Sequence, residues 1–345
     1  MKVYFLRRLL LVPLTLLGIT LLVFMLIRLA PSALTDETRA RAADGIVAYS
    51  GACSHTGCDV TEWLHGSRML LCPCHDSEFD PADAARVDIG PARRRLAALP
   101  LDGLFFTGST ATGKTIARAG VENLKRITLE LGGKSPLIIC KDADLDKAVP
   151  VAAMAVYAHS GQICIAGSRL FVAREIQDEF IEKLTAFARG LKIGHGLDEG
   201  TDLGPLINAV QTEKVEGYIA KGKAEGARLV TGGGRPEGQG YAGGNFLEPV
   251  IFAGVKDEMT IAQEEIFGPV ISVLPFDTME QVVTRANATP YGLAAGIFTR
   301  DLGVAHRTVK KLKAGSVWVN MYHAIDPAVP FGGLKMSGYG KEGGV

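Results

Sequence analysis

The stretch GQICIAGSR, residues 161–169, decides how the rest of the chain is interpreted, together with LELGGKSP at residues 129–136. Cys164 in the first stretch and Glu130 in the second both lie close to glycines, which let a backbone approach a ligand closely. A thiol that acts as a nucleophile needs a nearby group that moves protons, and a carboxylate is one such group. Cys164 and Glu130 are therefore candidates for a reactive thiol and a nearby proton-transfer group.

Length and composition set the outer limits of the interpretation. The chain has 345 residues, of which 47% are hydrophobic, so it is long enough for two or three domains with a sizeable core. The formal net charge is +0, and this balance gives no indication of nucleic-acid binding. Four of the 6 cysteines fall within residues 53–74, which favours a local metal site over a disulfide framework.

From about Asp102 to the C-terminus the chain resembles the NAD(P)-dependent aldehyde dehydrogenase superfamily. The two opening stretches match the nucleophile and general-base motifs of that family. The resemblance implies an α/β fold, with a catalytic domain over 132–345 and a truncated, Rossmann-type remnant of the NAD(P)-binding domain over 102–131. Further stretches match in the family's order: FLEPVI (246–251), EEIFGPV (264–270), PYGLAAGIFTRD (290–301), GSVWVN (315–320) and PFGGLKMSGYGKEGG (330–344).

The same resemblance implies a reaction and assigns residues to it. Cys164 would attack an aldehyde to give a thiohemiacetal, a hydride would pass to NAD(P), and Glu130 would activate the water that hydrolyses the thioester. Glu265 and Phe267 match the positions that hold the nicotinamide ribose and ring. The product would be a carboxylic acid. Tyr157, His159, Phe331 and the run IDPAVPFGG (325–333) resemble family members that oxidise aromatic aldehydes, which implies an aromatic substrate.

A glycine-rich turn at residues 105–115, FFTGSTATGKT, allows two interpretations. Residues 108–115 spell G-x-x-x-x-G-K-T, a phosphate-binding motif of ATPases, but no apolar run ending in a magnesium-binding aspartate follows. In the dehydrogenase interpretation, Gly108 and Ser109 approach the pyrophosphate of the cofactor at a helix N-terminus.

Hydrophobic periodicity predicts alternating strands and helices in this part of the chain. Predicted strands cover 127–131, 137–140, 169–172 and 227–231, and predicted helices cover 144–157, 177–188 and 212–225.

A cluster of cysteines and histidines precedes the dehydrogenase-like part. CSHTGC (53–58) and CPCHDSEF (72–79) each combine thiols with an imidazole, and two thiolates with two imidazoles suit a [2Fe–2S] cluster with mixed ligands. A structural zinc site is the alternative for the same four ligands. The arrangement resembles a small all-β Rieske domain over about 36–101, within a segment of 33–101. The resemblance implies iron ligands at Cys53, His55, Cys72 and His75, and a disulfide between Cys58 and Cys74.

The first 32 residues differ from both of these parts. Residues 9–27 carry no charge over 19 positions, which at about 1.5 Å per residue approaches the roughly 30 Å core of a bilayer. Basic residues precede this run and predict a retained transmembrane helix with its N-terminus inside; a signal peptide and a buried helix are the alternatives. Residues 1–32 resemble the first transmembrane helix of an ABC transporter permease.

The dehydrogenase family has further parts that the chain does not match. The family carries a tryptophan–asparagine motif before the position of Phe105, whereas here Trp63 is followed by Leu64. The asparagine forms half of the oxyanion hole, and losing one such donor typically costs about 10²–10³ in rate. The resemblance therefore implies an impaired dehydrogenase, which also has no match to the family's C-terminal oligomerisation strand.

The three resemblances together describe a composite chain. The alternative function is a membrane-anchored Rieske electron-transfer protein with an inert dehydrogenase fragment, and a third is a protein that docks on intact relatives. The apolar run at 9–27 predicts a membrane-anchored location, and without it the dehydrogenase resemblance implies the cytoplasm.

Overall fold

The computed structural model describes residues 62–64, 69–72, 77–80, 86–89, 103–121 and 124–344. The predicted transmembrane helix at 9–27 lies outside these residues. In the part of the chain that is described, no helix is long and apolar enough to span a bilayer.

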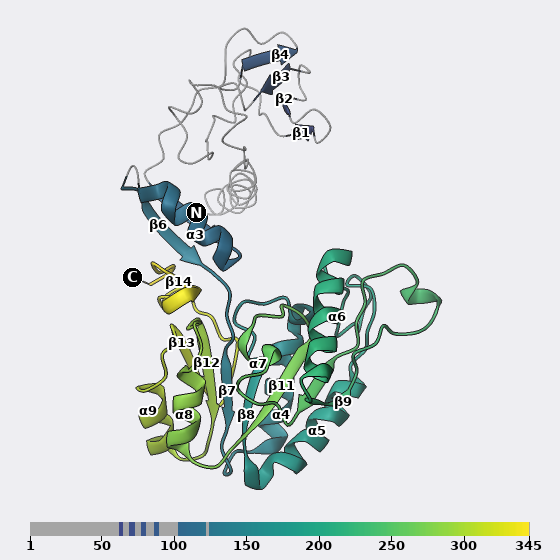
Figure 1. Cartoon of the computed structure of the whole chain (residues 1–345), viewed down its shortest axis with the longest axis vertical. Helices are drawn as coiled ribbons and strands as arrows, with labels where there is room; N and C mark the ends of the chain where they lie inside the picture. The colour runs from purple at the N-terminus through teal and green to yellow at the C-terminus, as the bar shows by residue number, and fades with distance from the viewer. Residues whose placement is uncertain are drawn as a thin grey trace, which may run out of the picture. The chain divides into compact units, whose positions relative to one another are not determined.

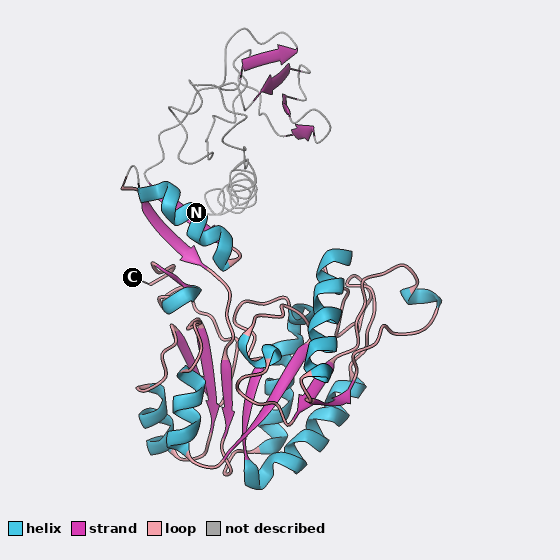
Figure 2. Cartoon of the chain, in the orientation of Figure 1, coloured by secondary structure: helices cyan, strands magenta, loops and turns pink. Residues whose placement is uncertain are grey.

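Seven strands build the main sheet of the C-terminal part, shown with its flanking helices in Figures 1 and 2. They are β7 (Pro136–Ile139), β8 (Arg169–Ala173), β9 (Arg228–Thr231), β10 (Val250–Ala253), β11 (Val270–Phe276), β12 (Ala294–Phe298) and β13 (Ser316–Val319). Their order is β13-β12-β7-β8-β11-β10-β9, and every neighbouring pair is parallel except β9 with β10. Parallel strands covered on both faces are expected to be continuously apolar, and all residues of β7, β8 and β12 are buried.

Helices cover both faces of this sheet, which gives the molecule two apolar layers. The helices are α4 (Leu145–Tyr157), α5 (Gln177–Gly190), α6 (Ala209–Ala224), α7 (Thr260–Gln263), α8 (Met279–Asn287) and α9 (Leu302–Val309). Leu137 and Ile139 of β7 face the layer that contains α4 and α5, whereas Ile138 faces the layer with residues of α6, α7 and α8. Successive side chains of a strand point to opposite faces of the sheet, so the side chains of β7 contribute to both hydrophobic layers.

Three of the helices that flank the main sheet begin at a side chain that accepts a backbone N–H. Asn208 caps α6 through Gln211 N, Thr278 caps α8 through Gln281 N, and Asp301 caps α9 through Val304 N. Caps of this kind satisfy N–H groups that have no partner within the helix, and each typically stabilises a helix by about 1 kcal/mol.

A smaller sheet carries Glu130 at the end of its central strand. Its order is β14-β6-β5, with β5 (Gly103–Thr107), β6 (Arg126–Glu130) and β14 (Gly338–Tyr339). Gly338 pairs with Glu130 in the antiparallel ladder between β14 and β6, which joins the C-terminal segment to the predicted general base. Helix α3 (Thr110–Val121) follows β5, and the Ser109 hydroxyl caps it by accepting the N–H of Thr112 at 3.1 Å.

The N-terminal strands form a separate antiparallel sheet. It has the order β1-β2-β3-β4, with β1 (Glu62–Leu64), β2 (Met69–Cys72), β3 (Ser77–Asp80) and β4 (Arg86–Ile89). The residues of this segment that the structure describes form strands, and the all-β fold of the whole segment stays a prediction. The chain divides into two units. The first comprises residues 1–104 and 114–127, and the second comprises residues 105–113 and 128–345, which include all residues of the candidate active site.

Candidate active site

The nucleophile candidate lies in the connection between α4 and β8, which is held at several points. Gly161 has a φ of 74°, and a side chain there would overlap the backbone of Gly268. The Tyr322 hydroxyl donates a hydrogen bond to the carbonyl oxygen of Ile165 at 2.8 Å, directly after Cys164. Cys164 is half-buried, and these contacts leave its loop little freedom to move.

Two glycines join Cys164 to Glu265. A side chain at Gly133 would overlap the carbonyl oxygen of Cys164, and one at Gly132 would overlap the Glu265 carboxylate. The Gly133 N–H donates to Glu265 Oε1 at 3.0 Å. The glycines of LELGGKSP are thus required because two other segments approach the backbone where a Cβ would stand.

A buried serine fixes these glycines to the C-terminal segment. The Ser337 hydroxyl donates to the carbonyl oxygen of Gly132 at 2.7 Å and accepts the N–H of Gly292 at 3.0 Å. The carbonyl oxygen of Ser337 in turn accepts the N–H of Leu131 at 3.0 Å. Three segments far apart in the sequence consequently hold the stretch between Glu130 and Cys164.

Glu130 is buried without a hydrogen-bond partner among the described residues. Its side chain is 4% exposed, and neither carboxyl oxygen is satisfied. Burial, followed by the charge of Glu342, raises the pKa of Glu130 from its ordinary value of 4.5 to about 7, although Lys341 opposes this. A carboxyl group with a pKa near neutrality can both accept and release a proton at physiological pH, as a general base must.

Negative charge also acts on the nucleophile candidate. Burial, followed by the charges of Glu265 and Glu130, raises the pKa of the Cys164 thiol. Burial likewise raises the pKa of Glu265, and the Gly133 N–H, Lys214 and Lys134 oppose that shift. The thiol is therefore mostly protonated in this structure and needs a base to form the thiolate.

The predicted cofactor residues differ in what holds them. Phe267 has a φ of 59°, in the left-handed region that is unfavourable for non-glycine residues, and the Gln211 amide donates to its carbonyl oxygen at 2.8 Å. The Gly108 N–H donates to the carbonyl oxygen of Glu130 at 3.0 Å, which sets the turn after β5 against the predicted base. Ser109 is exposed, and its hydroxyl already caps α3.

The predicted iron ligands cannot be placed in the same way. Cys72 ends β2, and Cys53, His55 and His75 lie outside the described residues, as do Cys58 and Cys74. In the described part of the chain, no group of three or more His, Cys, Asp or Glu side chains could hold a metal ion.

The parallel sheet, the half-buried thiol, the buried Glu130 and the half-buried Glu265 agree with the family that the sequence resembles. A model of the aldehyde dehydrogenase family matches residues 96–345, and the chain belongs to this family. A model of the Rieske [2Fe-2S] domain matches residues 27–100.

Several known proteins are similar to the dehydrogenase part. The betaine aldehyde dehydrogenase of Brucella anthropi is 50% identical over 240 residues, which are 70% of this chain and 49% of that protein. A putative aldehyde dehydrogenase of Bacillus subtilis is 44% identical over 304 residues, which are 85% of this chain and 60% of that protein. The chain thus spans about half the length of most curated relatives it matches.

Solved structures show the same fold. A betaine aldehyde dehydrogenase of Staphylococcus aureus in complex with NAD+ has a TM-score of 0.69 and 42% identity, with 71% of this chain and 48% of that one covered. An aldehyde dehydrogenase of Bacillus cereus in an NAD+ complex has a TM-score of 0.68 and 48% identity, with 71% and 49% covered.

Sequence reasoning missed three charged residues at this site. Lys341 and Glu342 stand in the matched stretch at 330–344, but nothing in a single sequence indicates that they influence Glu130. Lys134 follows the two glycines and is almost wholly buried, although lysine is among the residues most often exposed. Only tertiary packing reveals these neighbours.

Replacing Gly132 with alanine is expected to disturb Glu265 selectively. The new Cβ would displace the carboxylate and break its hydrogen bond to Gly133 N–H, and hydrogen bonds to charged groups contribute about 1.5–3 kcal/mol. If Glu265 holds the cofactor, the KM for NAD(P)+ should rise about tenfold or more. Gly217→Ala is the matched control, because nothing lies within 4 Å of a Cβ there. An unchanged KM in Gly132→Ala would exclude this role.

Proposed function

We propose that this chain oxidises an aldehyde to a carboxylic acid with NAD(P)+, through a covalent intermediate on Cys164. The observation that carries the proposal is the grouping of a half-buried thiol with two carboxyl groups: the charges of Glu265 and Glu130 both act on the Cys164 thiol, and Gly133 lies between the Cys164 carbonyl oxygen and Glu265. The similarity to aldehyde dehydrogenases supports the same chemistry.

The protonation states suit the two halves of such a reaction. Glu130, with a pKa of about 7, accepts the Cys164 proton directly or through water, and the thiolate then attacks the carbonyl carbon. Glu130 gives this proton to solvent during the oxidation; the carboxylate then accepts a proton from the water that cleaves the thioester and returns it to the Cys164 sulfur as the carbon–sulfur bond breaks. Cys164 leaves as the thiol once the acid is released.

The residues present fit a dinucleotide near Cys164. Glu265 presents a carboxylate fixed by Gly133 N–H, and the chain at Phe267 is held in a left-handed conformation beside it. We assign Glu265 and Phe267 to the nicotinamide end, and Gly108 and Ser109 to the pyrophosphate. When bound, NAD(P)+ accepts the hydride; all proton transfers remain with this chain's own side chains.

The test of this proposal is NADH or NADPH formation with a panel of aliphatic and aromatic aldehydes. We expect turnover that depends on Cys164. A covalent acyl adduct on Cys164, seen by mass spectrometry after mixing with aldehyde and NAD+, is expected at the same time. Absence of both adduct and NADH would refute the proposal.

We further propose that residues 33–101 bind a [2Fe–2S] cluster through Cys53, His55, Cys72 and His75, with Cys58 and Cys74 as a bracing disulfide. The match to the Rieske model and the donor set of two thiols and two imidazoles support this. The proposal predicts two irons and two acid-labile sulfides per chain. Zinc in place of iron would instead indicate the structural alternative.

A further inference from the structure

Lys134 is a buried amine that the proposed reaction does not use. Its side chain is 1% exposed, and its Nζ has no hydrogen-bond partner among the described residues. An isolated buried ammonium is costly, so proteins usually pair it or leave it neutral. A lysine in this position therefore requires an explanation from its surroundings.

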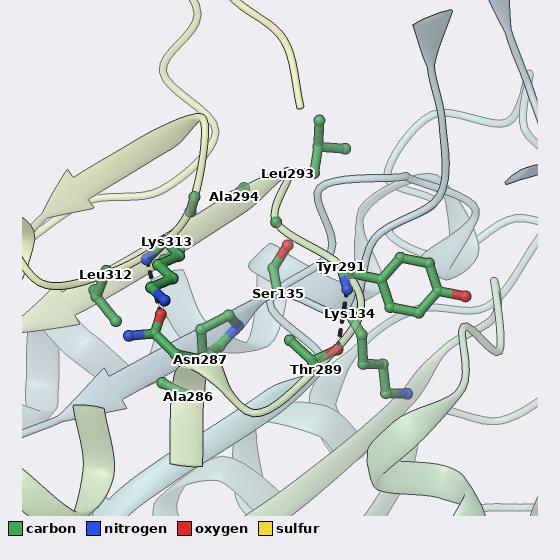
Figure 3. A pocket seen from close by; sticks show the side chains of 14 residues that line it. Lys134, Ser135, Ala286, Asn287, Thr289, Tyr291, Leu293, Ala294, Leu312 and Lys313 are labelled. Atoms are coloured by element: carbon green, nitrogen blue, oxygen red, sulfur yellow. Dashed lines mark hydrogen bonds between the residues drawn. The ribbon is translucent and has the colours of Figure 1, made fainter. Parts of the chain in front are cut away.

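The backbone of Lys134 cannot withdraw from the site. Its carbonyl oxygen accepts Arg169 Nε at 2.9 Å, and the buried Arg169 guanidinium is anchored in turn to the carbonyl oxygen of Ala286 at 2.8 Å. Figure 3 shows the Lys134 side chain extending below the Tyr291 ring and away from Asn287 and Lys313. The amine is thus fixed at its base and directed away from the small pocket that both residues line.

Charged groups from several elements surround the amine. They are Arg169 of β8, Lys214 of α6, and Glu264 and Glu265 before β11. Tyr218 of α6 donates to Glu264 at 2.8 Å, and Tyr291 before β12 interacts electrostatically with both glutamates. Burial, followed by the charge of Arg169, lowers the pKa of Lys134 from 10.5 to about 7, and the two glutamates oppose this.

Of the two acidic groups around Lys134, Glu265 has the larger effect on the pKa of the amine. Glu265 binds the N–H of Gly133, the residue that immediately precedes Lys134 in the chain. Lys134 favours the ionised form of Glu265 as well. Lys214 has the larger effect of the two lysines on the pKa of Glu265, but it is exposed, and solvent screens charges at the surface much more than buried ones.

We propose that Lys134 is a positioning residue for Glu265, whose carboxylate it keeps ionised and held against the Gly133 N–H while the amine is protonated. Loss of the amine's proton releases this constraint, so the site responds to pH near neutrality. One consequence rests on the proposed function: binding of the cofactor ribose by Glu265 should change with pH. The electrostatic part concerns only this chain's own residues and does not depend on turnover.

The test is a double-mutant cycle of Lys134→Met and Glu265→Gln in the full chain, read as unfolding by urea at pH values from 5 to 9. We expect a coupling of at least about threefold in the unfolding equilibrium constant near pH 6–7, where at least half of the Lys134 amine is protonated. The coupling should vanish above about pH 8, where the amine is neutral, and decline again at low pH as Glu265 is protonated. Lys134→Gln is a second variant should Lys134→Met fold poorly.

Controls separate charge from packing. Lys134→Arg should preserve the coupling, and the Lys214→Met/Glu265→Gln cycle should give a smaller coupling that added salt removes. A coupling that is absent at every pH, or that is constant across the range, would overturn the proposal. Because no cofactor is present, a chain without dehydrogenase activity but with the expected coupling would refute the proposed function and leave this inference standing.

Discussion

Changing Cys164 to serine is expected to lower aldehyde-dependent NAD(P)H formation by at least about 10³-fold. A serine hydroxyl is far less acidic than a thiol, and Glu130, with a pKa of about 7, is too weak a base to ionise it. Removing the nucleophile of a comparable covalent mechanism costs up to about 10⁶. The change in absorbance at the nicotinamide band measures the rate.

A second thiol provides the control for this experiment. Cys140 is buried in β7's C-terminal turn, its Sγ contacts the sulfur of Met279 at 3.7 Å, and burial raises its pKa to about 12. Cys140→Ala should therefore leave turnover unchanged, and iodoacetamide should modify Cys164 in preference to Cys140. Equal loss of turnover in the two variants would indicate damage to the fold and contradict a nucleophilic role for Cys164.

The sequence predicts the elements of the C-terminal part well where the apolar pattern is long. The helix predicted at 177–188 is α5 at Gln177–Gly190, and the strand predicted at 137–140 is β7 at Pro136–Ile139. The helix predicted at 212–225 begins earlier, at Ala209, because Asn208 caps it and this polar signal lies outside the apolar pattern.

Strand order and the electrostatics of the site could not be predicted from periodicity. Periodicity predicts a strand at residues 137–140, which is β7. It does not predict that β7 lies between β12 and β8, because β12 follows more than a hundred residues later in the chain. The pKa of Glu130 depends on Glu342, which the antiparallel pair of Phe331 with Glu342 brings to it. Motif matching finds the residues that react, whereas their protonation depends on partners that only the folded chain brings together.

Replacing Glu130 with glutamine is expected to change two measurements in opposite directions. Turnover should fall by about 10²–10⁴, because an amide cannot accept the proton from water or thiol. Alkylation of Cys164 at pH 8 should instead become faster, since the Glu130 charge is one of the causes that raise the thiol's pKa. A residue with a merely structural role would not increase thiol reactivity and abolish turnover together.

The pH dependence of turnover distinguishes a general base from a general acid, because a base loses activity below its pKa. The pKa of Glu130 is raised to about 7, so the carboxyl group is neutral and unable to accept a proton below that pH. Turnover should fall about tenfold for each unit below pH 7, and this limb should be missing from the residual activity of Glu130→Gln. Glu342→Gln removes a repulsive charge and should move the limb to lower pH, because Glu342 is the second cause of the raised pKa. A limb that stays in place in Glu342→Gln and persists in Glu130→Gln would assign the titration to another group and remove Glu130 from the role of base.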